Sequence, residues 1–282
     1  MIPSNFTYKK ANDVAEALSM MSEYGDKATL LAGGHSLIPA LKLRLNDYGY
    51  LIDISKIQDL KNISENGNGI TIGAGVSHAA IAQSSLLQSK ISFFAEAAEL
   101  IGDVQVRNMG TIGGSIAHAD PAADWPALLL ASGASIEIQN NQGKKEVKAE
   151  DFFQGLFTTS LEEGDMITAI HLPVVENASS KYMKFMHPAS RFALVGCAAQ
   201  VLTSGGKCEM AHIAYAGVSS KPFRDESVEK ALIGNTFNEE TISAAAEKAA
   251  EGVSIMSDHF ATESYRKQMA KVYTKRTLLA MT

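Results

Sequence analysis

Apolar residues recur along the chain with periods that predict a mixture of helices and strands. The runs Ala28–Ala32 and Tyr50–Ile54 suit buried strands, whereas Asn12–Tyr24 has the spacing of an amphipathic helix. Asn12 is expected to be the N-cap of that helix and Gly25 to end it. A β–α–β beginning of this kind predicts a small first lobe that covers about residues 1–55.

The pattern changes in the next segment, which predicts a second lobe over about residues 56–176. Asn66-Gly67-Asn68-Gly69 is a hairpin turn signal between two apolar runs. The strands expected in this lobe are Leu60–Ile63, Ile70–Gly73, Ala134–Gln139, Lys144–Lys148 and Met166–Leu172. The helices expected are a short one from Ser77 to Ile81, one at Phe93–Ile101, and one that opens at Asp120-Pro121 and reaches Ala131.

The last part of the chain, residues 177–282, has long apolar stretches followed by helical patterns. Three antiparallel strands are expected at Lys181–His187, Phe192–Leu202 and Cys208–Val218. Three helices are expected at Ser227–Ile233, Glu239–Glu251 and Tyr265–Met281. Strands followed by helices predict a separate α+β domain with a helical bundle.

Two glycine pairs are the candidate ligand-binding segments of the chain. Leu30-Leu31-Ala32-Gly33-Gly34-His35-Ser36-Leu37 reads as a strand, a glycine turn and the start of a helix. Such a turn can point backbone N–H groups at an anion, and glycine permits both positive φ and close approach. Thr111-Ile112-Gly113-Gly114-Ser115 repeats this chemistry before the helix expected at Asp120, so two loops are predicted to hold the two phosphates of a dinucleotide. The sequence contains neither G-x-G-x-x-G nor G-x-x-x-x-G-K-[ST], which disfavours the two best-known nucleotide folds.

Composition narrows the class of partner. The chain has 282 residues, 46% hydrophobic residues and a net charge of −6, which argues against a nucleic-acid surface. No apolar run has the length of a membrane span and no signal peptide is visible, so a cytoplasmic location is expected, with contact at the inner face of the membrane left open. Cys197 and Cys208 are too few for the four thiolates of an iron–sulfur cluster and are expected to be buried free thiols.

The stretches AGGHSL and RNMGTIGGSIAHADPAAD closely resemble the flavin-carrying medium subunits of the molybdenum hydroxylases. That family includes the medium subunit of aerobic carbon monoxide dehydrogenase and the FAD subunits of xanthine dehydrogenase-like enzymes. The resemblance implies an α+β fold: a two-lobed FAD-binding domain of the PCMH (vanillyl-alcohol-oxidase-like) type over residues 1–176, then the C-terminal domain.

The resemblance also implies how the chain works. It implies noncovalent FAD, a large partner with the molybdenum–pterin site and a small partner with [2Fe–2S] clusters, assembled as a dimer of heterotrimers. Electrons would pass from the clusters through FAD to an external acceptor, with quinone, NAD⁺ and oxygen all open. No residue of this chain is expected to be catalytic, because the difficult chemistry belongs to the cofactors.

Particular residues gain roles from the same resemblance. Asp124 is expected to accept hydrogen bonds from flavin hydroxyls, and Lys184 to lie near the isoalloxazine, with a solvated strand lysine as the alternative. His35 is expected to contact the cofactor rather than act as an acid or base. The cofactor-binding set predicted in full is Leu30, Leu31, Ala32, Gly33, Gly34, His35, Ser36, Leu37, Ile101, Thr111, Ile112, Gly113, Gly114, Ser115, Asp124, Ile167, Lys184 and Phe192.

Other interpretations are compatible with parts of this pattern. His118, Asp120 and Asp124 have metal-like spacing, but helix capping explains the carboxylates better and no metal is expected. The chain could also be an FAD subunit of a xanthine, aldehyde or N-heterocycle dehydrogenase. A self-contained flavin oxidase with covalent flavin and a nonenzymatic nucleotide-binding scaffold are the alternatives from other classes.

Overall fold

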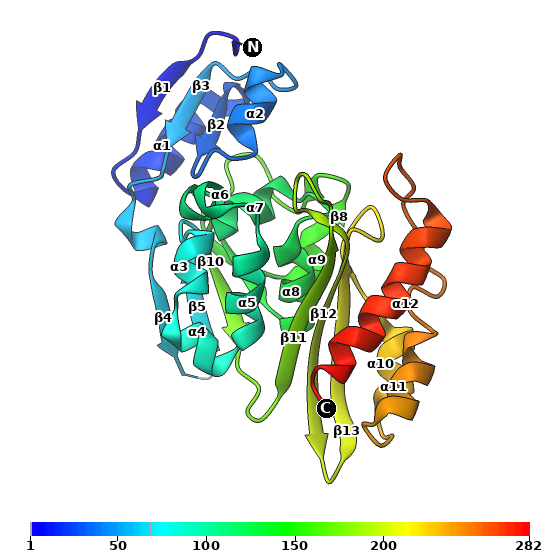
Figure 1. Ribbon diagram of the computed structural model, residues 1–282. Helices are drawn as coiled ribbons and strands as arrows, with labels where there is room; N and C mark the ends of the chain where they lie inside the picture. The colour runs from blue at the N-terminus through cyan, green and yellow to red at the C-terminus, as the bar shows by residue number, and fades with distance from the viewer. Residues whose placement is uncertain (1, 68) are drawn as a thin grey trace.

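The computed structural model describes residues 2–67 and 69–282. Three parts follow one another in the chain: an N-terminal lobe, a second lobe on an antiparallel sheet, and a C-terminal sheet covered by helices (Figure 1). Position 68 of the expected hairpin turn lies outside the described residues, and on either side of it Asn66 pairs with Gly69.

The N-terminal lobe is a three-stranded parallel sheet in the order β1-β3-β2. Its elements are β1 (Thr7–Lys10), α1 (Val14–Tyr24), a 3₁₀ turn (Gly25–Lys27), β2 (Ala28–Leu31), α2 (Leu37–Lys42) and β3 (Tyr50–Asp53). The N-cap of α1 is Asp13, whose side chain accepts from the Glu16 N–H, so the expectation of Asn12 was wrong. The backbone N–H and the side-chain amide of Asn12 instead both donate to the Glu16 carboxylate.

The second lobe is an antiparallel sheet in the order β4-β5-β10-β6-β7. Its strands are β4 (Ile63–Asn66), β5 (Gly69–Gly73), β6 (Ser135–Asn140), β7 (Gly143–Lys148) and β10 (Met166–Pro173), beside a small hairpin of β8 (Phe153–Gly155) and β9 (Thr158–Thr159). Its helices are a 3₁₀ turn (Gln58–Leu60), α3 (His78–Ala82), α4 (Ser85–Lys90), α5 (Ser92–Leu100), α6 (Val104–Met109), α7 (Ile112–His118), α8 (Asp124–Ser132) and α9 (Ala149–Phe152). The expected strand Leu60–Ile63 therefore begins later, and α4 and α6 were missed because each is only six residues long.

Helix α8 is the centre of the molecule. All nine of its residues are buried, which fits a helix that is apolar all round and packed between layers. It begins at Asp124, so the expected start at Asp120-Pro121 was wrong. The carbonyls of Pro121 and Ala122 accept hydrogen bonds from Gly217 and Ala193 of the C-terminal sheet, and they are therefore not used to start the helix.

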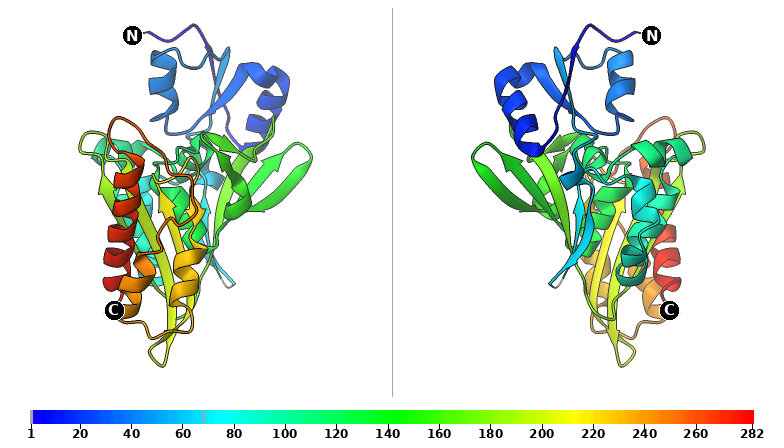
Figure 2. Two further views of the ribbon diagram at one scale, coloured as in Figure 1. Left: turned by 90° about the vertical axis from the view of Figure 1, so that its right-hand side faces the viewer. Right: turned by 90° about the vertical axis from the view of Figure 1, so that its left-hand side faces the viewer.

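The C-terminal part is an antiparallel sheet in the order β11-β12-β13-β14 with helices on one face. Its elements are β11 (Ser179–Met186), β12 (Ala193–Ser204), β13 (Lys207–Ala216), β14 (Phe223–Arg224), α10 (Glu226–Leu232), α11 (Glu239–Ala246) and α12 (Glu263–Leu279). The expected three strands are present, and the short β14 adds a fourth at the edge. Helix α12 packs on β11 and β12 (Figure 2). Helices α5 and α8, which belong to the second lobe, also contact strands of this sheet.

One hydrophobic core therefore joins the second lobe to the C-terminal sheet. It contains α8 residues together with Tyr182, Ala198 and Ala214 from that sheet. The two cysteines are free and buried, as expected. Within residues 2–67 and 69–282, no helix is both long and apolar enough to cross a membrane.

Candidate functional site

The first glycine pair lies where β2 ends and α2 begins. Gly34 has φ +74°, a conformation that side-chain-bearing residues rarely adopt. The backbone N–H groups of residues 33–36 donate to no acceptor among the described residues. A run of free N–H groups around a left-handed residue is a concave site for an anion, as the sequence predicts.

The second glycine pair has a different structure from the one expected. It is not a loop before a helix, because Thr111 is the N-cap of α7 and Gly113 and Gly114 form the first turn of that helix. The N–H groups of Ile112 and Gly113 donate to Val76 and Ala74, 3.0 and 2.9 Å away. The Gly114 N–H donates to Thr111 Oγ1 at 3.1 Å, so the expectation that this pair offers free N–H groups was wrong.

Gly113 and Gly114 instead allow close packing. A Cβ on Gly113 would lie 2.5 Å from the Ala74 Cβ, which no side chain could tolerate. A Cβ on Gly114 would lie 2.9 Å from Thr111 Oγ1 and 4.0 Å from the Ala32 Cβ of the first loop. Gly113 therefore packs tightly on Ala74, and Gly114 leaves bare backbone opposite Ala32 of the first loop, which supplies the hydrogen-bond donors.

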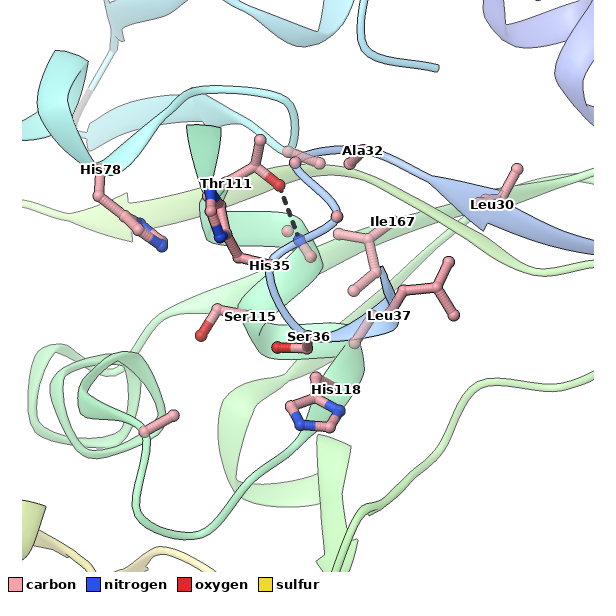
Figure 3. A pocket seen from close by; sticks show the side chains of 18 of the residues that line it. Leu30, Ala32, His35, Ser36, Leu37, His78, Thr111, Ser115, His118 and Ile167 are labelled. Carbon is pink, nitrogen blue, oxygen red and sulfur yellow. Dashed lines mark hydrogen bonds between the residues drawn. The ribbon is translucent and has the colours of Figure 1, made fainter. Parts of the chain in front are cut away.

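The two glycine segments enclose a cavity of about 480 Å³. A Cβ on Gly33 would lie only 2.1 Å from the Met109 carbonyl oxygen, so the N-terminal lobe rests directly on the turn before α7. Figure 3 shows His35 and His78 on one side of the site, with Leu37 and Ile167 on the other. This volume lies in the range of cofactor pockets, and the combination of free N–H groups and apolar walls fits a bound dinucleotide.

Most of the predicted binding residues line this cavity. Those that do are Leu30, Ala32, Gly33, Gly34, His35, Ser36, Leu37, Ile101, Thr111, Gly113, Gly114, Ser115, Asp124, Ile167 and Phe192. Leu31, Ile112 and Lys184 do not line it. Ile112 is fully buried in the core, and Leu31 packs under the loop near Gly34. Contact of the lining residues with a cofactor stays a prediction.

Lys184 is not a solvated strand lysine, so that alternative was wrong. It does not line the cavity itself, and its place near the isoalloxazine stays a prediction. Its side chain is fully buried, with Nζ 3.0 Å from Asp124 Oδ2. The same ammonium donates to the Arg191 carbonyl at 2.7 Å. Lys184 therefore ties the start of α8 to the turn that carries Arg191 and Phe192, both of which line the cavity.

Asp124 is shared between the cavity and this buried pair. Its Oδ1 accepts from the Tyr182 hydroxyl at 2.5 Å, while Oδ2 accepts from Lys184. Burial raises the pKa of Asp124 and lowers that of Lys184, whereas each partner favours the charged form of the other. The carboxylate is thus held in place by the C-terminal sheet, and its remaining lone pairs are the ones that could accept from a ligand.

His35 is exposed in the first loop and lines the cavity. Its ring makes no hydrogen bond to any residue of the described chain, which agrees with a contact role and leaves that role a prediction. His118 also lines the cavity, but no group of three or more potential metal ligands occurs among residues 2–67 and 69–282.

Several lining residues were missed from the sequence. They are mostly supplied by turns and by α6, for example Asn46, Tyr48, Val106, Gly110 and Arg191. His78 was also missed, although it follows a serine N-cap at the start of α3, a position from which a side chain can face a neighbouring site. The sequence did not indicate His78 as a site residue, because it lies far from both glycine pairs along the chain.

Comparison with known proteins agrees with this geometry. The family model described as "FAD binding domain in molybdopterin dehydrogenase" matches residues 4–175, and the one described as "CO dehydrogenase flavoprotein C-terminal domain" matches residues 180–281. The glyceraldehyde dehydrogenase medium chain of Sulfolobus acidocaldarius is 39% identical over 276 residues, which cover 98% of each chain. The carbon monoxide dehydrogenase medium chain of Afipia carboxidovorans is 36% identical over 279 residues, 99% of this chain and 97% of that one.

A solved structure has the same fold. A chain of carbon monoxide dehydrogenase from Hydrogenophaga pseudoflava superimposes with a TM-score of 0.96 at 38% identity. The alignment covers 100% of this chain and 98% of that chain, so all three parts of the fold are shared.

Proposed function

Because this chain belongs to the FAD-binding medium subunits of the molybdenum hydroxylases, we propose that it is the electron-transfer flavoprotein of such a complex. The observation that carries the proposal is the row of free N–H groups at residues 33–36, which faces the bare glycine surface of α7 across the cavity. When bound there, FAD accepts electrons from one partner and passes them to another.

The residues of this chain would bind and orient the cofactor. Residues 33–36 donate to phosphate oxygens, and Gly114 allows the pyrophosphate to approach the backbone closely. Ile101, Ile167 and Phe192 supply apolar walls that exclude water from the ring. The binding is noncovalent in this proposal, with His35 in contact with the cofactor.

The remaining redox centres belong to partner chains. Two cysteines cannot hold an iron–sulfur cluster, so the [2Fe–2S] clusters lie on a small subunit and the molybdenum site on a large one. We propose a dimer of such heterotrimers, from which electrons leave to an external acceptor: quinone, NAD⁺ or oxygen.

Substrate choice is proposed to lie outside this chain. Medium chains of a glyceraldehyde dehydrogenase and of a carbon monoxide dehydrogenase are 39% and 36% identical to it, although the named substrates differ greatly in size and polarity. A subunit that carries electrons for either enzyme has no need to recognise the substrate.

A spectrum and an activity assay test the proposal. The protein should be yellow, should release FAD on acid precipitation, and should oxidise no substrate without its partners. Yellow colour that stays with the acid precipitate would instead support the covalent flavin oxidase, and a colourless protein that binds no added FAD would support the scaffold. Substrate oxidation by the lone chain would refute the electron-transfer proposal.

A further inference from the structure

His78 is a buried polar side chain in the wall of the cavity. The residue is 5% exposed and lines the pocket from the start of α3. The indole Nε1 of Trp125 donates to His78 Nδ1 at 3.1 Å. Trp125 is fully buried in α8 and stacks on Phe94 with 5.7 Å between ring centroids, so the indole donor has a fixed position.

The Trp125 contact determines where the imidazole proton lies. An indole N–H can only donate, so Nδ1 of His78 must be the acceptor and carries no proton. Burial, aided by nearby His35 and Arg107, lowers the pKa of His78 to about 4, so the ring is neutral at pH 7. A neutral imidazole with a bare Nδ1 carries its proton on Nε2.

The Nε2 atom lies beside Gly110, which also lines the cavity. A Cβ on Gly110 would lie 2.8 Å from His78 Nε2, so the ring reaches the turn between α6 and α7 only because residue 110 is glycine. The His78 N–H also donates to the Gly110 carbonyl at 3.0 Å, which fixes the backbone there. Nε2 itself has no acceptor in the part of the chain that the structure describes, and Figure 3 shows the ring on the side of the site where His35 lies.

We propose that His78 is a further binding residue of this pocket: Trp125 holds its neutral ring with the proton on Nε2, and that N–H donates to an oxygen of the bound dinucleotide beside the first glycine loop. The proposal rests on the FAD-binding function proposed above. The Nε2–H group makes no hydrogen bond to the described residues, so an oxygen of the bound ligand can accept from it. The neutral Nε2–H group also supplies one more hydrogen-bond donor beside the backbone N–H groups of residues 33–36, and it places no positive charge in the cavity wall.

The first test reads the tautomer directly. Protein labelled with ¹⁵N-histidine should give one neutral ring whose Nδ1 resonates as an unprotonated nitrogen and whose Nε2 carries a proton at pH 7. In Trp125→Phe the indole donor is gone, and the same ring should populate both tautomers. A proton on Nδ1 of the unaltered protein would overturn the proposal, whether or not flavin binds.

The second test removes only the proposed donor. In His78→Asn the amide oxygen can take the place of Nδ1 and accept from Trp125, whereas nothing replaces Nε2. His171→Asn is the matched control, because His171 lies on β10, bonds Thr71, and does not line the cavity. Flavin affinity is measured by titrating FAD into deflavinated protein, isolated with any partner subunits that accompany it.

We expect His78→Asn to bind FAD about tenfold more weakly and His171→Asn to match the unaltered protein. Addition of FAD should also shift the Nε2 resonance of the unaltered protein. Equal affinity of His78→Asn and the unaltered protein would overturn the role of His78 and leave the proposed function intact. Failure of the unaltered protein to bind FAD would overturn the proposed function itself.

Discussion

Replacement of Lys184 by methionine tests the buried ion pair between the two layers. The ammonium lies 3.0 Å from Asp124 Oδ2, and the exposed fractions of the two side chains are 0% and 5%. Methionine keeps most of the bulk, and of the two side chains that bond Asp124 in residues 2–67 and 69–282 it leaves the Tyr182 hydroxyl. It also removes the donor to the Arg191 carbonyl, which holds the turn at the cavity wall.

The expected cost is large because a buried charge loses its partner. Breaking a buried pair from one side typically costs about 3–5 kcal/mol. At roughly 2–4 °C per kcal/mol for a chain of this size, the melting temperature should fall by at least about 6 °C. The second substitution Asp124→Asn in the same chain should restore part of this loss, because no unpaired carboxylate then remains.

Lys181 provides the matched control on the same strand. It pairs with Glu96 at 2.9 Å, but the two side chains are 31% and 39% exposed. Solvent screens such a pair, so Lys181→Met should cost about 0–1 kcal/mol. Calorimetric melting of the two variants beside the unaltered protein decides the question. A loss for Lys184→Met no greater than that for Lys181→Met would refute the buried-pair argument.

The flavin potential gives a second readout for the same variant. An unpaired lysine near the ring would change the potential by about 20–45 mV on removal, which corresponds to roughly 1 kcal/mol for two electrons or one. Here the field of the ammonium is opposed by that of Asp124, so potentiometric titration of Lys184→Met should show a smaller shift. A decrease as large as that for a free cation would show that the ammonium acts on the flavin directly.

Three further predictions concern the second glycine pair, His78 and the two cysteines. Gly114→Val should fold but lose flavin, because its side chain enters the space before Ala32. Gly113→Ala should instead fold poorly, because its Cβ would lie 2.5 Å from the Ala74 Cβ. Full flavin occupancy in Gly114→Val would contradict the first of these expectations. The folded pKa of His78, about 4, lies below the unfolded value of about 6.5, so the unfolded state takes up the proton first as the pH falls. About 3 kcal/mol of the unfolding free energy should therefore be lost between pH 6.5 and 4, a loss that urea titrations should find missing in His78→Asn. Burial raises the pKa of Cys197 to about 12 and that of Cys208 to about 11, so neither should react with a thiol reagent until the chain unfolds; fast reaction of native protein would show that one of them is accessible.

Local patterns in the sequence predicted most helices and strands and the first glycine loop of the site, between β2 and α2. The apolar run before Gly33, the glycine pair and the apolar spacing after it predicted strand β2, the turn and helix α2. These features depend on interactions within a few residues, such as positive φ at Gly34 and helical periodicity. The same reasoning located the β4–β5 and β6–β7 hairpins of the second lobe, but not β8–β9. It also located three of the four strands and the three helices of the C-terminal part.

Tertiary structure decided what the second glycine pair and the charged residues do. Ala74 and Val76 occupy the N–H groups at the start of α7, and no pattern near Gly113 could show that. Lys184 meets a carboxylate 60 positions away, and Trp125 meets a histidine 47 positions away. The energy of a charge or a donor depends on burial and on which partner packs beside it, and only the folded chain brings such distant groups together.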